Sequence, residues 1–438
     1  MARVKEAYFP LDWDAIEACP DLERVGMVLN NLPDEALMRA LEGRVMGRPD
    51  AVGVRAKWNI LLSGRILGHV TVQSMLRELQ RNPTLRRIVG LNPMAGPAGV
   101  PDKDEMSRFW KKLVESRRAE VEELREETVR KLRVHLPDLG RQLGTDTTAL
   151  ETWARGRREP KSSADPDADW GRKTRRWTDA QGGAHEDVTK WFGYKAHLVV
   201  DTRHELPLAG RVTKASRPDN EYVMEMVGEL KGLGLSPETL SGDKAYDGGP
   251  QTEALWSEYR VRAVFDLRDT AQDGEDGTRL EGARNILLGN DGRVYCFARN
   301  RGKTIKQAMA PWGFEKDRGA LKFRCPAAVA RMECPERERC GRGSYGRVVR
   351  VKNHLDWRRF GTMARGSRQW KRLYSARTAC ERVNARLKTG LGLADLRVRG
   401  LKNVQMTVSL AILAMYGLAL GHLRRGAKEW RSWTRVAR

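Results

Sequence analysis

The sequence predicts a mixed α/β protein in which a sheet is flanked by helices, with an all-helical region before it and a small β-rich insertion within it. Residues 1–138 carry apolar side chains at helical spacings. Residues 139–268 alternate β-favouring runs with helical patterns, as a sheet with covering helices requires. A basic stretch at 269–360 interrupts the pattern, and helical spacing returns at 361–438. We therefore expect two parts of one core separated by an inserted subdomain.

The charge balance is strongly basic. The 438 residues include 80 Lys and Arg against 57 Asp and Glu, which gives a formal net charge of +23. A surplus of this size is typical of proteins that bind a polyanion, with nucleic acid ahead of a membrane surface. An ordinary arginine-rich protein is the alternative. We favour nucleic acid because the basic residues run through every region.

The cellular setting is predicted from three features. The first 19 residues lack the apolar core of a secretory signal. The long apolar run Val404–Leu420 contains polar residues and is short for a membrane span, so a buried helix is the better interpretation. The six cysteines do not form a disulfide framework, which fits a reducing compartment. We expect a cytoplasmic protein without a membrane partner.

The N-terminal region is predicted to be a helical DNA-binding or dimerisation domain. The expected helices are Asp21–Asn30, Pro33–Glu42, Ala51–Leu67, Val72–Gln80 and a long helix that ends near His135. Asp102 or Asp104 is a suitable N-cap for the last of these. Basic residues crowd the later helices, which favours contact with nucleic acid, while a plain helical bundle remains the alternative.

The central region is predicted to form the sheet. Lys190–Asp201 and Glu205–Ser216 are expected to pair as a hairpin. A helix follows, and then a strand ends at Asp243, in the sequence TLSGD, before a further helix and strand. Side chains at the carboxyl ends of strands are where such sheets present their active groups. His197 and His204 receive no functional role, because a lone histidine near a strand is usually structural.

The segment Tyr374–Lys388 is predicted to be one helix with two distinct faces. The polar face holds Tyr374, Arg377, Glu381 and Lys388. The apolar stripe, suited to packing on a core, holds Ala376, Cys380, Val383 and Leu387. The helix would present one carboxylate beside two cations and a phenol. A solvated basic helix with an incidental glutamate is the alternative.

The pattern Tyr-x2-Arg-x3-Glu-x6-Lys resembles the YREK signature of a large group of DDE transposases, the enzymes of bacterial insertion sequences. The resemblance implies a ribonuclease H-like core in which Glu381 is the third of three metal-binding carboxylates. It also implies that Arg377 and Lys388 bind DNA phosphates and that Tyr374 positions the DNA end. The segment that contains LRRIVGLNP is similar to the domain that precedes the core in many such enzymes.

The same resemblance guides the choice of the other two carboxylates. Asp146 lies in a β-favouring segment, in an Asp-x-Thr context similar to the first family motif. The competing residues, Asp165, Asp167 and Asp169, lie in a proline-broken loop and stay open as alternatives. Asp243, in GDKAYD, resembles the second motif, and Asp247 is expected to be a cap or turn residue for the following helix.

The resemblance implies metal-dependent DNA chemistry. Asp146, Asp243 and Glu381 would hold two Mg²⁺ ions, with Mn²⁺ able to substitute. The substrates would be double-stranded DNA, both the transposon ends and the target. Two ends must be brought together, so we expect a homo-oligomer, at least a dimer. A nuclease that mobilises no element and an inert DNA-binding regulator are the alternatives.

The insertion holds four of the six cysteines: Cys296, Cys325, Cys334 and Cys340. Four thiolates are able to bind structural zinc. Their spacing contains no Cys-x2-Cys pair, so reduced cysteines in a small β-rich subdomain are the alternative.

Overall fold

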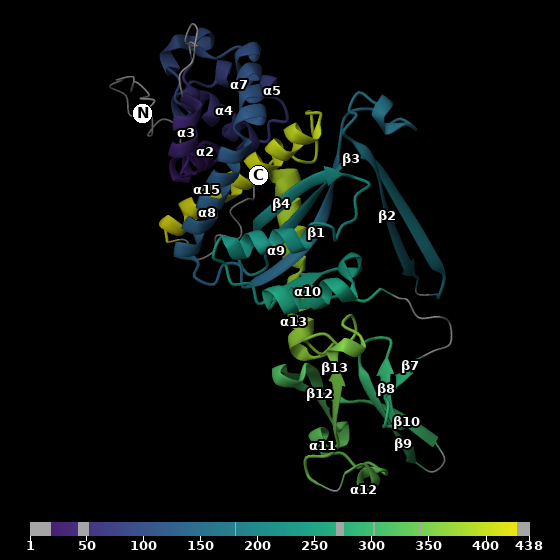
Figure 1. Ribbon diagram of the computed structural model, residues 1–438. Coiled ribbons are helices and arrows are strands. Elements are labelled where there is room, and N and C mark those ends of the chain that lie inside the picture. The colour runs from purple at the N-terminus through teal and green to yellow at the C-terminus, as the bar shows by residue number, and fades with distance from the viewer. Residues whose placement is uncertain are drawn as a thin grey trace.

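The structure is a computed structural model that describes residues 19–42, 52–179, 181–268, 276–300, 303–341 and 343–426. Figure 1 shows N-terminal helices at one end of the molecule, a central sheet, and a smaller β-rich part at the other end. The sheet and its flanking helices confirm the predicted mixed α/β class.

The N-terminal region consists of helices and turns throughout its described residues. They are α2 (Pro20–Asn31), α3 (Glu35–Glu42), α4 (Val54–Ile66), α5 (Val72–Arg81), α6 (Pro83–Val89), α7 (Lys103–Ser116) and α8 (Arg118–His135). Asp102 caps α7, because its Oδ1 accepts a hydrogen bond from the Glu105 backbone at 2.7 Å. The single long helix predicted to reach His135 is wrong: Arg117 leaves helical geometry and separates α7 from α8. Residue 51, where one helix was expected to begin, lies outside the described residues.

The C-terminal helix α15 (Leu401–Arg424) joins the N-terminal helices to the sheet. It is apolar and long enough to cross a membrane by composition, but nearly all of it is buried inside the protein, as predicted. A Cβ added at Gly417 would meet Val28 at 2.8 Å, so glycine is what lets α2 approach α15. Buried residues of α15, the N-terminal helices and the sheet form one continuous core.

The central sheet is mixed. Its strands are β1 (Gln142–Glu151), β2 (Asp169–Thr178), β3 (Ala184–Asp201), β4 (Leu206–Lys214), β5 (Thr239–Gly242) and β6 (Arg262–Phe265). The order is β2-β3-β1-β5-β6, with β4 on the later half of β3. The β3 contacts are antiparallel, while β1, β5 and β6 run parallel. Helices α9 (Val223–Gly232) and α10 (Gly249–Tyr259) connect the later strands.

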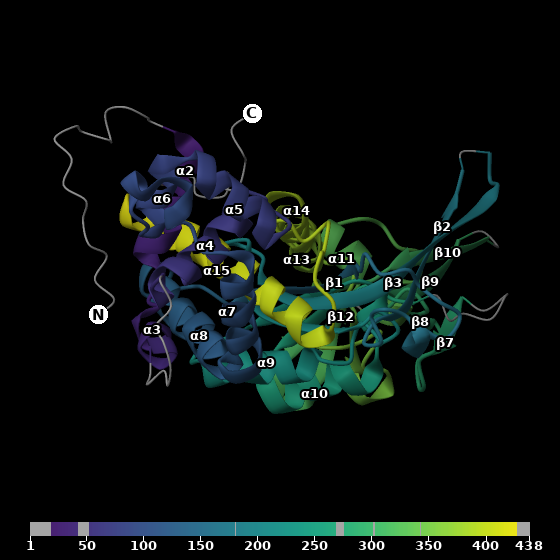
Figure 2. The same ribbon diagram turned by 90° about the horizontal axis from the view of Figure 1, so that it is seen from above.

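The hairpin of β3 and β4 confirms the sequence prediction, but β2 was not predicted. β2 pairs with the first half of β3 along Asp169↔Gly193 to Thr178↔Ala184. The resulting β2–β3 ribbon projects from the body of the molecule (Figure 2). Its sequence, DWGRKTRRWT, is basic and has little apolar alternation, because much of it does not face a core.

The insertion forms two small sheets over a core of its own. One sheet has the order β10-β9-β8-β7 and contains β7 (Gly277–Arg279), β8 (Ile286–Gly289), β9 (Val294–Asn300) and β10 (Lys303–Ala308). The other contains β11 (Ala310–Glu315), β12 (Ala320–Arg324) and β13 (Val348–Lys352). Two short helices, α11 (Pro326–Ala330) and α12 (Arg337–Cys340), lie between β12 and β13. The buried cluster of this part is separate from the main core.

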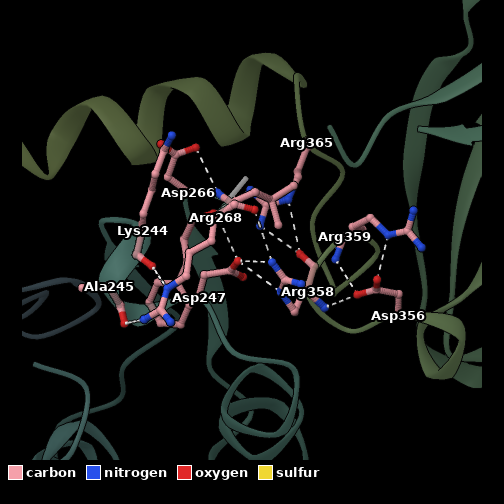
Figure 3. Close-up of polar contacts among 11 residues, drawn as sticks. Lys244, Ala245, Asp247, Asp266, Arg268, Asp356, Arg358, Arg359 and Arg365 are labelled. Atoms are coloured by element: carbon pink, nitrogen blue, oxygen red, sulfur yellow. Dashed lines mark hydrogen bonds and ion pairs between the residues drawn. The ribbon is translucent and has the colours of Figure 1, made fainter. Parts of the chain in front are cut away.

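Asp247 links the sheet to the end of the insertion. Its Oδ2 accepts hydrogen bonds from Arg358 Nη2 at 2.6 Å and from the Arg268 backbone at 2.9 Å (Figure 3). Asp247 was expected to be a cap or turn residue for the next helix. The turn is confirmed, since Asp247 ends the helical turn Lys244–Tyr246, whereas α10 begins after Gly248 without a side-chain cap. The Asp247 carboxylate is buried, and a buried charge needs a partner of opposite charge. The Arg358 guanidinium is that partner.

Candidate carboxylate site at the ends of parallel strands

Asp146 lies near the middle of β1, where it pairs with Leu198 of β3, two residues beyond the last pair of β1 with the parallel strand β5. Its Oδ2 accepts a hydrogen bond from Asn384 Nδ2 at 2.9 Å. Burial, and next the charge of Asp243, raise the pKa of Asp146 to about 6, although Arg377 and Lys173 act in the opposite direction. A buried carboxylate whose ionised form is disfavoured by a neighbouring negative charge marks a place suited to a cation.

Asp243 directly follows β5, at its carboxyl end. Its Oδ1 accepts a hydrogen bond from the Ala245 backbone at 2.8 Å, which starts the single helical turn Lys244–Tyr246. Because β1 and β5 are parallel neighbours, this turn stands beside Asp146. The parallel arrangement thus brings together two residues that are far apart in the sequence.

The segment predicted as one helix consists of α13 (Arg368–Ala376), α14 (Thr378–Ala385) and a π-helical turn at Arg386–Gly390. The predicted helix is confirmed in its backbone, since Arg377, Ala385 and Arg386 at the junctions all have right-handed helical dihedral angles. Its hydrogen-bond pattern is not uniform: the break in it lies at Arg377, where the Cys380 backbone N–H bonds to the Arg377 carbonyl at 2.8 Å. The apolar stripe is confirmed for Cys380, Val383 and Leu387, which are fully buried, whereas Ala376 is half-buried.

Gly144 allows α14 to dock on β1. A Cβ added at Gly144 would lie 2.6 Å from Cys380 Sγ and 3.0 Å from Thr202 Cγ2, closer than side chains pack. Glycine in the interior of a strand weakens the strand, so its place here reflects a close approach. The contact holds the helix that carries Arg377 and Glu381 next to the strand that carries Asp146.

Arg377 lies among all three predicted carboxylates. Its Nη2 donates to Glu381 Oε1 at 3.0 Å. Burial acts to lower the pKa of Arg377, but Tyr374 and then Asp146, Glu381 and Asp243 raise it above its usual value. Glu381 itself is exposed, with 58% of its side chain accessible. The Arg377 guanidinium is thus a cation on which all three carboxylates act.

Tyr374 stands on the same side of α13 as Trp370, and the two rings stack at 4.8 Å with 10° between their planes. Burial and then the charge of Asp266 raise the pKa of the Tyr374 phenol. Asp266 follows β6, just as Asp243 follows the neighbouring β5, and sequence reasoning missed it. The stacked rings therefore border the carboxylate group.

Lys388 lies away from the carboxylates. Burial, and next the charge of Lys173, lower the pKa of Lys388, and Glu151 partly offsets this. Lys173 belongs to the unpredicted strand β2 and also acts on Asp146. The two lysines extend the positive surface from Asp146 toward the end of β1. No pattern in the sequence of β2 pointed to Lys173.

The loop aspartates have structural partners. Asp165 is fully buried and accepts hydrogen bonds from Tyr194 Oη at 2.6 Å and Thr152 Oγ1 at 2.9 Å. Asp167 accepts from the Leu401 backbone at 3.0 Å, at the start of α15. Asp169 accepts from Ser216 Oγ at 2.6 Å. These bonds favour Asp146 as the first carboxylate of the site.

A basic cleft of about 610 Å³ lies where the insertion meets the sheet. Its basic lining residues are Arg268, Arg293, Arg358, Arg359, Arg365 and Lys371, and Trp370 also lines it. Figure 3 shows the Arg358 side chain bonded to Asp247 and that of Arg359 bonded to Asp356, with Arg268 and Arg365 beside them. The cleft is thus continuous with the Trp370–Tyr374 stack beside the carboxylates.

The carboxylate set suits a hard divalent cation in its chemistry. Within the described residues, no three Asp, Glu, His or Cys side chains are placed so as to hold a metal ion. The reason at this site is visible in the contacts: Glu381 is turned to Arg377, and Asp146 is bonded to Asn384. The residues fit such an ion provided that Glu381 leaves Arg377.

Residues 160–416 match a family model described as the transposase DDE domain, which is more than half of the chain. The protein therefore belongs to this family of DDE transposases, whose members are generally dependent on divalent metals for DNA transposition. The matched span contains Asp243 and Glu381 and begins after β1, so it does not reach Asp146.

The other comparisons add little to this assignment. No curated protein matches the sequence. Among solved structures, the chain is similar to a piggyBac transposase in a cryo-EM synaptic complex with hairpin DNA, at 12% identity and a TM-score of 0.36, over 98% of this chain and 81% of that one. A score this low does not define the fold.

Proposed function

We propose that the protein is the transposase of a bacterial insertion sequence, of the YREK group, with a ribonuclease H-like core. It would bind the terminal inverted repeats of its element, cleave the DNA there and join the freed ends to target DNA. The observation that carries the proposal is the docking of α14 on β1, which gathers Asp146, Asp243 and Glu381 around Arg377.

Asp146, Asp243 and Glu381 are the proposed ligands of two Mg²⁺ ions, for which Mn²⁺ substitutes. Such ions, when bound, activate the attacking water or hydroxyl and stabilise the leaving oxygen. Asn384 keeps the Asp146 carboxylate oriented by its hydrogen bond. The raised pKa of Asp146 means that cation binding must also displace a proton at mildly acidic pH.

Arg377 is proposed to change partners during the reaction. Without metal it neutralises the carboxylates, and its Nε is buried without a hydrogen-bond partner in the described structure. A guanidinium released from Glu381 is suited to hold a DNA phosphate with two parallel hydrogen bonds. Lys388, with Lys173 beside it, would contact the backbone farther along the strand.

Double-stranded DNA is the proposed partner, both as the element's ends and as target. The formal charge of +23 and the arginine-lined cleft beside Trp370 support this, because contacts to phosphates dominate DNA affinity. Pairing of two ends requires a homo-oligomer, at least a dimer, and the reaction takes place in the cytoplasm.

The proposal is tested by incubating the full chain with linear DNA that carries the repeats flanking its own gene, with Mg²⁺ or Mn²⁺. We expect cuts at the repeat ends that disappear with a chelator and with scrambled repeats. Cuts independent of the repeats would indicate a nuclease that mobilises no element. Binding to the repeats without cleavage in either metal would contradict the enzymatic proposal and favour a DNA-binding regulator.

A further inference from the structure

Four cysteines of the insertion converge on one small cavity. Cys296 lies in β9, Cys325 directly precedes α11, Cys334 lies before α12, and Cys340 ends it. All four are free, half-buried thiols, and they line a single cavity of about 30 Å³. Burial, and then the three other thiols, raise the pKa of Cys296 to about 11, so the four lie within electrostatic reach of each other. Their separations in sequence gave no reason to expect this convergence.

The segment 326–348, which follows Cys325 and carries Cys334 and Cys340, has almost no hydrophobic core. Among the described residues between 326 and 348, Ala327 alone is a buried apolar residue. Val329, Met332 and Tyr345 are all more than 40% exposed. The two helices here have five and four residues, too short to be stable alone. Small units that lack a core need a disulfide or a metal ion to hold them together, and these thiols are not paired.

The surroundings of the cavity suit thiolate ligands. Asn285 Nδ2 donates a hydrogen bond to Cys340 Sγ at 3.3 Å, and Arg347 Nη1 donates to Asn285 Oδ1 at 2.7 Å. Hydrogen bonds of this kind orient metal ligands and stabilise their charge. Arg337 also lines the cavity. Glu336 lines it as well, so the guanidinium of Arg347, held at Asn285, is the positive group that the contacts place beside the thiols.

The four sulfur atoms are farther apart than they would be around a metal ion. Among the described residues, no three metal-binding side chains are close enough together to hold one. Neutral thiols have no mutual attraction that would draw them together. Around zinc, with Zn–S near 2.3 Å, neighbouring sulfurs in a tetrahedron stand about 3.8 Å apart. Rotation about χ1 moves each Sγ while the backbone stays in place. The relevant observation is therefore that all four cysteines line the same small cavity.

We propose that Cys296, Cys325, Cys334 and Cys340 bind one structural zinc ion. Four protein ligands close the coordination sphere and leave no position for substrate. The ion ties the 326–348 segment to β9 and thereby completes the fold of the insertion. The inference does not depend on the proposed DNA chemistry, because the site lies outside the carboxylate group.

The test is the zinc content of the full chain, expressed with added zinc and purified with a reductant that does not bind metal. We expect about one zinc per chain, and close to none after Cys334→Ser with Cys340→Ser. Cys19→Ser is the matched control and should keep the zinc, since Cys19 packs against the main core. Zinc absent from the unchanged protein, or fully retained by the double variant, would overturn the proposal.

A second measurement uses only the unchanged protein and so remains valid if the variants fail to fold. Alkylation followed by mass spectrometry should find the four cysteines protected before zinc chelation and modified after it. Equal modification before and after chelation, or disulfides among the four in the reduced, zinc-treated protein, would also overturn the proposal.

Discussion

The carboxylate site and the cysteine site are held in place in opposite ways. The carboxylate site is positioned by packing. Helix α14 packs on β1 through Gly144 and Cys380, inside a core that extends to the N-terminal helices. At the cysteine site, the 326–348 segment has one buried apolar residue within its described part. The insertion as a whole has its own core, so the proposed cross-link is needed only by the 326–348 segment, whereas the carboxylates would need a cation only for chemistry.

The largest expected effect is on catalysis alone. Glu381→Gln should reduce DNA cleavage by about 10³-fold or more, because each carboxylate ligand supports ions that contribute several kcal/mol to the transition state. Its thermal stability should be almost unchanged, because the Glu381 side chain is exposed. Glu253→Gln, an exposed change on α10, is the matched control. Single-turnover cleavage at the repeat ends is the measurement, and normal cleavage by the variant would remove Glu381 from the site.

Gly144→Ala should lower both stability and activity, in contrast to Glu381→Gln, which should lower activity alone. The added methyl would press on Cys380 Sγ, and we expect a loss of about 1–3 kcal/mol in the free energy of unfolding. Adding Cys380→Ala should restore part of the loss, since it removes the nearest atom. Denaturant unfolding of the two single variants and the double variant gives the coupling. Strictly additive effects would argue against the close approach.

Asp146→Asn should stabilise the metal-free protein at neutral pH. Folding raises the pKa of Asp146 from 3.8 to about 6, so the folded state holds more protons in that window and stability falls as pH rises through it. Removing the charge should recover about 1–3 kcal/mol above pH 6, and the gain should vanish below pH 3.8. Melting temperatures with a chelator from pH 3.5 to pH 8 measure this. If the variant is less stable than the unchanged protein at every pH, the charged Asp146 carboxylate does not cost the folded state stability.

Lys388→Ala should have the smallest effect. We expect a several-fold weaker affinity for DNA. The slope of log K against the logarithm of the salt concentration should become shallower by about one, as for the loss of one phosphate contact. Cleavage at saturating DNA should be close to normal, because Lys388 lies away from the carboxylates. Binding titrations at several salt concentrations provide the values. An unchanged salt slope would show that Lys388 does not touch the backbone.

The sequence predicted those features that depend on local pattern. The buried stripe of Cys380, Val383 and Leu387 was readable from helical spacing, and α15 from its apolar run. The break in the hydrogen-bond pattern at Arg377 was not, because the backbone there stays helical and leaves the spacing almost unchanged. β2 was missed because a ribbon that faces solvent lacks the apolar alternation that marks a strand.

Contacts between distant segments also escaped prediction. Asp247 was expected to be a cap or turn residue, but no local pattern indicated its hydrogen bond to Arg358, which is 111 positions away. The proximity of Asn384 to Asp146 depends on how α14 crosses β1, which no local pattern encodes. The same holds for the four cysteines, whose convergence is set by the fold of the insertion.

The measurement that tests the carboxylate site most directly is backbone cleavage of the protein by bound Fe²⁺. With ascorbate and peroxide, iron in place of magnesium cuts the chain beside its ligands. If these three carboxylates hold the metal, we expect cuts near Asp146, Asp243 and Glu381, and we expect excess Mg²⁺ to suppress them. Cuts near Asp165 to Asp169 in place of Asp146, or cuts that Mg²⁺ does not suppress, would contradict this assignment.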